Sequence, residues 1–420
     1  MDMNFKAIYS LCIPFLMCAI MLMICIGCER DTNIQDTKPP LTGTIEPGVV
    51  DANTQFGFNL FNEILNTEED INIFISPFSV SLALAMTLNG AAETTEQAMT
   101  DTLQLQGNDS ETINTSYALL LQALKTSDPK VTLEIANSLW ADQHFTFNQD
   151  FLQRNTDYFG AEVSTLDFRD SNSVDTINQW VNTNTNGKIE KILEKIAEDE
   201  ILFLINAIYF KGAWQTEFDP ANTRDNTFHL TDGSQKQVPM MTREDTYPFY
   251  YASDFTAISL PYGEGRVSMY IFLPSQNSSL DQFLENLNAE NWQEWISQFR
   301  EQKVWLQIPR YKFKYKSNLN NVLKALGMGI AFDENAANFN RMLPDSAVTT
   351  GNLFISRVDH KTFVEVNEEG TEAAAVTNVG IGVTSAPPQF IVNRPFFFVI
   401  HDNETKTVLF MGTVIDPTQK

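Results

Sequence analysis

The stretch Glu368–Pro388, EEGTEAAAVTNVGIGVTSAPP, has mostly small side chains, contains no Lys or Arg, and ends in two prolines. It lies between two segments whose composition is typical of strands, Phe363–Val366 and Phe390–Val392. A loop of more than about 15 residues is uncommon inside a compact domain and is usually functional or disordered. We therefore look for the function of the protein in this loop first.

The first half of the loop has the side chains that a strand needs to enter the middle of an existing sheet. Successive side chains of a strand point to opposite faces, so Thr371, Ala373 and Ala375 share one face. These three are small and uncharged, and Glu372 falls on the other face. Gly370 can supply the pivot. The alternative is a flexible Ala- and Gly-rich loop that inserts nowhere.

The rest of the chain mixes helix and strand patterns without the alternation of a βαβ fold. Ser76 followed by Pro77 is a good helix start, since Ser caps the first turn and Pro fits its first position. A second helical pattern runs from Leu319 to Leu326 and is stopped by Gly327. These features predict ordinary core helices.

Three further segments have strand patterns. Ile201–Phe210 is a nearly continuous apolar run, which predicts a strand buried on both faces. Tyr311–Lys316 alternates strictly, as a half-exposed strand does. Phe396–Ile400 and Val408–Met411 flank a polar tetrapeptide and predict a β-hairpin. Together with the helices, these strands predict one large α+β domain with extensive sheet.

Composition excludes several classes of function. The 420 residues include 43% apolar and 11% aromatic side chains, enough for a large core, and the net charge of -25 argues against nucleic acid as a partner. All four cysteines lie within the first 28 residues, so the folded body has no disulfide, thiolate metal site or cysteine nucleophile. The four histidines include no metal-ligand spacing. We expect no metal and no cofactor.

An enzyme is the least favoured class, because no catalytic motif is present. Paired carboxylates remain open in a chain with 53 Asp and Glu residues, and a Ser-His-Asp contact cannot be seen in a sequence. Steady turnover of a substrate would reverse this interpretation.

The N-terminus has the features of a targeting segment. Lys6 precedes the apolar run Ala7–Ile26, as in a secretory signal peptide. The run ends at Gly27-Cys28, which resembles the lipobox of prokaryotic lipoproteins, although Cys25 replaces the usual Leu. Lipidation of Cys28 is the favoured interpretation, and an uncleaved anchor helix is the alternative. Either would tether the exported body to a membrane, and a secreted form outside the cell is also open.

The N-terminal features divide the chain into three parts. We expect a lipoprotein-type signal peptide over residues 1–27, a flexible tether over 28–50, and one folded domain over 51–420.

The sequence resembles the serpin family, the serine protease inhibitor superfamily, in matching order and spacing from about Asn53 to Pro417. The blocks that carry the resemblance are Asn72–Thr95 (NIFISPFSVSLALAMTLNGAAETT), Leu204–Phe218 (LINAIYFKGAWQTEF), Val238–Met241 (VPMM), Ile308–Phe332, and Val366–Pro417 with NEEGTEAAAVT, NRPFFFVI and LFMGTVIDP. The resemblance implies an α+β serpin fold. That fold is a single large domain with three β-sheets, eight or nine helices, and an exposed reactive-centre loop at about 368–390.

The resemblance also implies a metastable inhibitor that is used once. A protease attacks the loop and forms an acyl-enzyme, and the loop then inserts into the central sheet and distorts the protease. The implied loop hinge comprises Glu368, Glu369, Gly370, Thr371, Glu372, Ala373, Ala374, Ala375 and Val376. Val376 is larger than the family's usual residue and could slow insertion.

Polar core residues govern the opening of the sheet in this family. The matching positions here are Ser76, Ser79, Asn206 and His360, and Trp214 matches a position near the start of insertion. The alternative is that the four polar groups are ordinary satisfied buried groups and that Trp214 is an ordinary core residue.

The resemblance implies where the bond offered to the protease lies: 14 residues on from Gly370, and at the distance before Asn393 that is common in serpins, which both give Thr384-Ser385. A slip to Val383-Thr384 is the alternative. Thr or Val suits the small apolar pocket of an elastase-like or subtilisin-like serine protease, and a papain-like cysteine protease could also accept the loop. Trypsin-like enzymes are poor candidates because the loop lacks Lys and Arg.

Two roles therefore remain for a serpin of this sequence. The first is the inhibitor, which we expect to be a monomer whose partners are a target protease and, through the N-terminal lipid, a membrane. The second is a non-inhibitory serpin that acts as a binding or chaperone protein. The small hinge residues favour the inhibitor.

Overall fold

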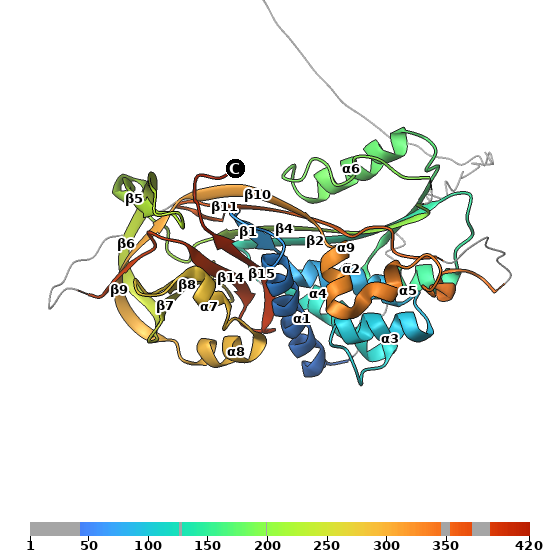
Figure 1. Ribbon diagram of the computed structural model, residues 1–420, viewed down its shortest axis with the longest axis horizontal. Helices are drawn as coiled ribbons and strands as arrows, with labels where there is room; N and C mark the ends of the chain where they lie inside the picture. Colours follow the sequence, from blue (N-terminus) through green and yellow to red (C-terminus); the bar gives the residue numbers. More distant parts are fainter. Residues whose placement is uncertain (1–42, 126–127, 199, 346–352, 372–386) are drawn as a thin grey trace, which may run out of the picture. The chain divides into compact units, whose positions relative to one another are not determined.

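Helices pack around three β-sheets in the computed structural model of the chain (Figure 1). The structure describes residues 43–125, 128–198, 200–345, 353–371 and 387–420. The α-helices of these residues are α1 Pro47–Leu65, α2 Pro77–Leu88, α3 Glu93–Thr102, α4 Ser110–Lys125, α5 Gln149–Phe159, α6 Asn172–Asn184, α7 Leu280–Leu284, α8 Ala289–Ser297 and α9 Asn320–Leu323. Shorter turns of helix are η1 Pro220–Asn222, η2 Lys324–Met328, η3 Gly329–Phe332 and η4 Asn340–Met342.

The strands form a nine-stranded sheet, a four-stranded sheet and a two-stranded sheet. The nine-stranded sheet contains β1 Ile73–Ile75, β5 Arg224–His229, β6 Gln235–Tyr251, β7 Phe255–Pro261, β8 Val267–Pro274, β9 Arg300–Pro309, β13 Gln389–Ile391, β14 Phe396–Asp402 and β15 Thr407–Val414. The four-stranded sheet contains β2 Val131–Asp142, β3 Glu162–Leu166, β4 Leu202–Ala213 and β12 Gly370–Thr371. The two-stranded sheet pairs β10 Tyr311–Asn318 with β11 Asp359–Val366. The expected α+β fold with three sheets is present in the described residues.

The four-stranded and two-stranded sheets lie beside each other and run along the same direction in Figure 1. No backbone pairing joins β4 to β11 in the part of the chain that the structure describes. The two sheets therefore form one layer that is split between β4 and β11. We call the four-stranded and two-stranded sheets together the split sheet.

Different helices cover the two faces of β2 and β4. Helix α6 covers one face, where Ile177 and Val181 pack with Phe203 and Ile205 of β4 in a small apolar cluster. Helix α2 packs on the other face, as part of the main core. Almost every residue of α2 is buried, as expected for a helix that is apolar all round.

The local signals in the sequence explain where several elements begin and end. The Ser76 side chain accepts a hydrogen bond from the backbone N–H of Ser79, and Pro77 opens α2, as predicted. The predicted hairpin is β14 and β15, and β10 alternates buried and exposed residues as expected. The second predicted helix is α9, which continues directly into η2, and Gly327 interrupts the helical turns as predicted, with a φ of 109°.

Two boundaries differ from the expectations. The folded domain begins at least as early as Pro47, where α1 starts, because Val49 and Val50 are buried in the core. The predicted tether over 28–50 is therefore too long at its end. The loop is also shorter than 368–390, since Gly370–Thr371 and Gln389–Ile391 are strands.

The strand predicted at Ile201–Phe210 is β4, but its first half is not buried on both faces. Leu202, Leu204 and Asn206 are only partly buried, because they line the split beside β11. Residues 41–420 form one compact unit. Within the described ranges no helix is both long and apolar enough to cross a membrane.

Candidate functional site

The base of the long loop is folded into a tight turn. Asn367 and Gly370 exchange backbone hydrogen bonds of 3.0 and 3.3 Å, and the Asn367 side-chain oxygen accepts the N–H groups of Glu369 and Gly370. Gly370 has a φ of 145°, and a Cβ atom there would lie 2.1 Å from the carbonyl oxygen of Gly212. Only glycine fits this position, so it allows the chain to reverse direction after β11.

The turn delivers β12 to the edge of β4 that faces the split. Gly370 lies opposite Ala213 and Thr371 opposite Gly212, in antiparallel register. The Thr371 side chain is buried, and its hydroxyl lies 2.9 Å from that of Tyr262. Burial raises the pKa of Tyr262, so the phenol stays neutral and can donate this hydrogen bond. Gly370 and Thr371 therefore form a short strand at this edge of β4.

Trp214 holds the same turn from the end of β4. Its indole N–H donates to the carbonyl of Asn367 at 3.0 Å, and its backbone N–H donates to the carbonyl of Glu369 at 3.0 Å. The indole ring stacks on the Tyr262 ring with a centroid distance of 4.5 Å. Trp214 thus lies at the base of the loop, where the resemblance to serpins places it.

Glu368 anchors the turn on its other side. Its carboxylate accepts a 2.6 Å hydrogen bond from the Thr223 hydroxyl and lies 3.3 Å from the Arg310 guanidinium. The Glu368 side chain is buried, and the backbone carbonyl of Glu368 accepts a 2.8 Å hydrogen bond from the backbone N–H of Phe218. A buried carboxylate needs such partners, because an unpaired buried charge is costly.

The predicted sheet-opening residues meet around the start of α2. The backbone N–H of Ser76 donates to Nε2 of His360 at 3.0 Å, and the Ser76 hydroxyl donates to the carbonyl of Leu409 at 2.7 Å. The Ser79 hydroxyl donates to the side-chain oxygen of Asn206 on β4. Through these contacts, α2 holds β4 and β11 from one face of the sheet.

His360 is neutral in this position. Burial lowers its pKa from about 6.5 to about 4, because the charged form of the imidazole loses its hydration. Since Nε2 accepts the Ser76 N–H, the imidazole proton sits on Nδ1.

A cleft of about 450 Å³ lies between β4, the segment before β11, and α2. Its lining is mainly apolar and includes Ser79, Leu84, Leu202, Leu204, Phe354 and His360. The cleft borders Leu202–Asn206 of β4, whose other end pairs with β12, so a strand that extended β12 along β4 would reach it. Among the described residues, no group of three His, Cys, Asp or Glu side chains could hold a metal ion.

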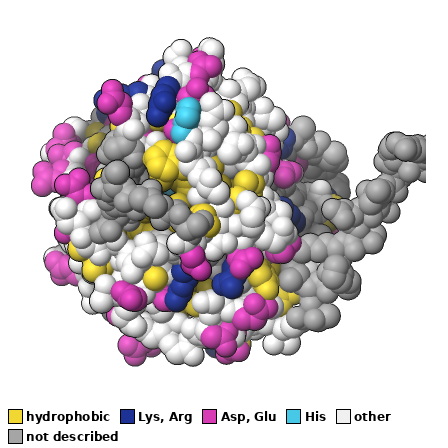
Figure 2. All heavy atoms as spheres, turned by 90° about the vertical axis from the view of Figure 1, so that its right-hand side faces the viewer, with side chains coloured by type: hydrophobic (Ala, Val, Ile, Leu, Met, Phe, Trp, Pro, Cys, Tyr) yellow, Lys and Arg dark blue, Asp and Glu magenta, His cyan; other side chains and the backbone are white. Residues whose placement is uncertain are grey.

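The surface at one end of the domain is acidic. Figure 2 shows the end that lies on the right in Figure 1, where Asp and Glu predominate over Lys and Arg and hydrophobic side chains are exposed between them. This distribution follows from the net charge of -25.

The structure brings together most of the predicted site residues. Ser76, Ser79, Asn206 and His360 form one cluster, and Glu368–Thr371 with Trp214 forms another at the far end of β4. The hinge residues Glu372–Val376, the bond Thr384-Ser385, and Cys28 lie outside the described residues.

Sequence reasoning missed several members of both clusters. Tyr262, Thr223 and Arg310 contact the turn, and the Asn137 side chain accepts a 2.7 Å hydrogen bond from Asn206. None lies in a sequence pattern that marks it, and each is far along the chain from its partner. Only Asn367, adjacent to the predicted hinge, could have been suspected as a turn residue.

The fold and the site define a class of protein. The chain is an α+β protein with a split sheet, and the base of its long loop, Gly370–Thr371, pairs with the edge of β4 that faces the split. Residues 51–417 match the family model described as serpin, serine protease inhibitor, and the chain belongs to the serpin family. Members of this family are generally protease inhibitors and not enzymes.

Individual relatives cover nearly the whole domain. Human Serpin B11 is 34% identical over 391 residues, which cover 87% of this chain and 98% of the relative. Mouse leukocyte elastase inhibitor A is 34% identical over 381 residues, with 87% and 98% coverage. The crystal structure of a thermophilic serpin, tengpin, in the native state has 33% identity and a TM-score of 0.81, and covers 89% of this chain and 95% of tengpin.

Proposed function

We propose that this protein is an irreversible suicide-substrate inhibitor of serine proteases. The observation that carries the proposal is the position of β12. Gly370 and Thr371 pair with one end of β4, and Leu202–Asn206 at its other end line a cleft, with no strand of the described residues paired to that edge. The loop that follows has room to continue as a central strand.

The register of β12 shows how the rest of the loop would fit. If the antiparallel pairing continues, each further loop residue lies opposite the preceding residue of β4, and Thr377 comes opposite Asn206. The side chains on the Thr371 face would point toward α2 and the cleft. They are Thr371, Ala373, Ala375, Thr377, Val379, Ile381 and Val383, and none is charged.

The residues on the opposite face suit insertion as well. Glu372 would lie at the edge of the sheet nearest the turn, followed by small residues. Val376 would lie opposite Ala207, which belongs to the apolar cluster under α6, so a larger side chain would meet a small partner. Val376, although larger than the usual residue of the family at this position, is therefore compatible with insertion.

The proposed mechanism begins when a protease attacks the bond Thr384-Ser385 and forms an acyl-enzyme. The freed loop then inserts between β4 and β11. About 14 residues at roughly 3.3 Å each would carry the attached protease roughly 45 Å, the length of a domain. The displaced protease is distorted before water can hydrolyse the ester.

Insertion is energetically downhill in this scheme. A central strand gains hydrogen bonds on both sides, and at about 1 kcal/mol each these sum to more than ~10 kcal/mol. The uncleaved protein is therefore metastable and persists because its conversion is slow.

The loop composition suggests the kind of target. Thr384, Val383 and Ile381 suit an elastase-like or subtilisin-like protease with a small apolar pocket. The similarity to mouse leukocyte elastase inhibitor A supports this choice. A papain-like cysteine protease is the cross-class alternative, because it also forms an acyl-enzyme.

The test is a covalent complex that survives boiling in SDS. The full chain in mild detergent is mixed with pancreatic elastase and, separately, with trypsin. We expect a complex with elastase, and the same complex with a Thr371→Ser variant. Thr371→Arg should be cleaved without forming it, because the buried site beside Tyr262 cannot accept a charged side chain.

The second candidate is a non-inhibitory serpin with a binding or chaperone role. Loop cleavage without a complex, across a panel of serine and cysteine proteases, would favour it over the inhibitor. Mass spectrometry of the cleaved product tests the bond, and a cut outside residues 382–386 would contradict the assignment to Thr384.

We also propose that the protein is an exported monomer anchored by a lipid on Cys28. The support is the lipobox-like sequence at the end of the apolar run. Labelling with a radioactive fatty acid should mark the protein, and Cys28→Ser should abolish both the label and the membrane association. Light scattering of a detergent-solubilised sample should give the mass of one chain.

A further inference from the structure

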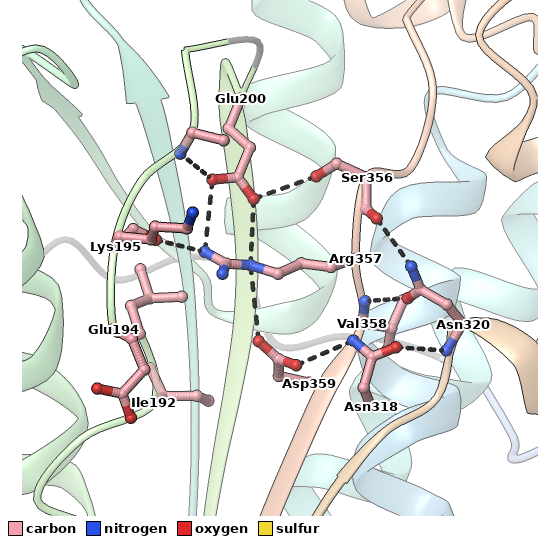
Figure 3. A network of polar contacts seen from close by, with 12 residues as sticks. Ile192, Glu194, Lys195, Glu200, Asn318, Asn320, Ser356, Arg357, Val358 and Asp359 are labelled. Carbon is pink, nitrogen blue, oxygen red and sulfur yellow. Dashed lines mark hydrogen bonds and ion pairs between the residues drawn. The ribbon is translucent and has the colours of Figure 1, made fainter.

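The two halves of the split sheet are connected at both ends. At one end, β12 and the turn before it join β11 to β4. At the other end, Glu200 lies just before β4 and Arg357 just before β11, and the two side chains meet in an ion pair (Figure 3). We call the Arg357–Glu200 pair the latch.

The latch spans the rim of the cleft. Nε of Arg357 lies 3.1 Å from one carboxylate oxygen of Glu200, and an NH₂ group donates to the other oxygen at 3.4 Å. The same guanidinium donates to the carbonyl of Lys195 at 3.0 Å and lies over the Phe203 ring. The side chain of Glu200 is only 4% exposed, against 22% for Arg357. Both residues line the cleft.

Further hydrogen bonds hold both partners of the latch, and the bond from Ser356 to Glu200 also crosses the split. Glu200 accepts hydrogen bonds from the backbone N–H of Ala197 at 2.7 Å and from the Ser356 hydroxyl at 3.3 Å. The backbone around Arg357 is fixed by Asn320, whose side chain accepts the Val358 N–H and donates to the Ser356 carbonyl, both at 2.8 Å. The side chains therefore meet across the split from two anchored segments.

We propose that the latch is the last barrier to insertion of the loop and sets how fast insertion is completed; this inference rests on the proposed function. If the register of β12 continues, Val383, the residue before Thr384, lies opposite Glu200. The last inserted residues would then occupy the space that the Arg357 and Glu200 side chains now cross. The earlier residues, up to Val379 opposite Leu204, would enter without meeting it.

The geometry of the latch is suited to opening. The hydrogen bond from Arg357 to Glu200 is long, and Nε of Arg357 has no aligned hydrogen-bond partner among the residues described. Arg357 can also keep a partner when the latch opens, since Asp359 on its own strand lies 3.6 Å away. Opening the latch therefore transfers the guanidinium to a neighbouring carboxylate, while the buried Glu200 carboxylate keeps only its hydrogen bonds from Ala197 and Ser356, so opening has a cost in free energy.

The test uses two synthetic peptides as probes of strand insertion into the full-length protein. The long peptide has the sequence of residues 371–383, and the short one that of residues 371–379. The rate at which each peptide forms a complex is followed by native mass spectrometry and by the rise in unfolding temperature. The variants are Glu200→Gln, which removes the charge across the split, and Asp359→Asn, the matched control, which removes a charge from the Arg357 side only.

We expect Glu200→Gln to accept the long peptide about tenfold faster than the wild type, because a charge-assisted contact is lost. The short peptide should insert into Glu200→Gln and into the wild type at the same rate. Asp359→Asn should not accelerate the insertion of either peptide. If the long peptide formed its complex at the same rate with Glu200→Gln and with the wild type, the latch would not be a barrier to insertion. An equal increase in rate for the long and the short peptide would also contradict the proposed role of the latch. Failure of both peptides to bind any form would instead contradict the proposed function.

Discussion

The nine-stranded sheet and the split sheet are built from similar apolar segments, yet they differ in how their strand edges are used. Every residue of β14 and β15 is buried, and β14 pairs with β8 on one side and β15 on the other. In the split sheet, β4 pairs with β2 along its length, and on its other side its partner among the described residues is the two-residue strand β12. The first sheet is complete, whereas the second has a place for one more strand.

In the proposed mechanism, this difference between the sheets is the source of the free energy of inhibition. A buried strand edge without a partner leaves backbone groups unsatisfied, and a cleft leaves apolar side chains without contacts. In the proposed mechanism, an inserted strand would pair with the edges of β4 and β11 and fill the cleft between them. The nine-stranded sheet supplies a rigid body against which this change can occur.

The largest expected effect is the loss of packing in the nine-stranded sheet. Phe398 is fully buried and packs against Phe74 with a centroid distance of 5.6 Å. Phe398→Ala should lower the free energy of unfolding by about 3–5 kcal/mol, because it leaves a cavity that its neighbours cannot fill. Leu204→Ala, beside the cleft, should cost less. Denaturant unfolding of both variants tests the order, and a larger cost at Leu204 would contradict the comparison.

A second prediction concerns pH and the polar cluster of the split sheet. The pKa of His360 is lowered to about 4 in the folded state and is about 6.5 when unfolded. Below pH 6.5 the unfolded chain takes up a proton that the folded protein resists, so stability falls as pH drops toward 4. The full loss is about 3 kcal/mol, and it is absent above pH 6.5.

The control for the pH effect is the buried His401 of the nine-stranded sheet, whose pKa is also lowered by burial. His360→Gln should flatten the profile of unfolding free energy between pH 4 and 6.5 and leave the contribution of His401. An unchanged acid profile in this variant would show that His360 does not titrate as described.

The smallest expected effect is at the start of β12. Tyr262→Phe removes the hydroxyl that contacts Thr371, at a cost of about 1 kcal/mol for a lost hydrogen bond. The turn should then open more often, so limited proteolysis near Thr371 should be faster by roughly fivefold. Tyr251→Phe is the control, since Tyr251 is 80% exposed. Equal cleavage rates in the two variants would mean that the hydroxyl does not hold β12.

Much of this architecture could be predicted from local sequence signals. The cap at Ser76, the alternation of β10 and the polar turn between β14 and β15 act within a few residues, and the structure has all three. The incomplete burial of β4 could not be predicted, because an apolar run looks the same beside a strand and beside a cleft. The position of the hinge could be predicted from its small residues and from its resemblance to serpins.

The contacts that hold the hinge and the latch were not predictable in the same way. Tyr262 and Thr371 are separated by 109 residues, and Arg357 and Glu200 by 157. Such pairs have no local pattern, since only the fold brings them together. Charged residues of this kind are also common on solvated surfaces, so their types alone do not mark them.

Insertion between β4 and β11 is tested most directly by hydrogen exchange of their amides before and after the loop is cut. Thermolysin is suitable for the cut, because a metalloprotease uses water and forms no acyl-enzyme that could be trapped. After cleavage, we expect at least about tenfold slower exchange along the cleft edges of Leu202–Phe210 and Asp359–Val366, as new strand hydrogen bonds form. Unchanged exchange in both strands after complete cleavage would contradict insertion between them.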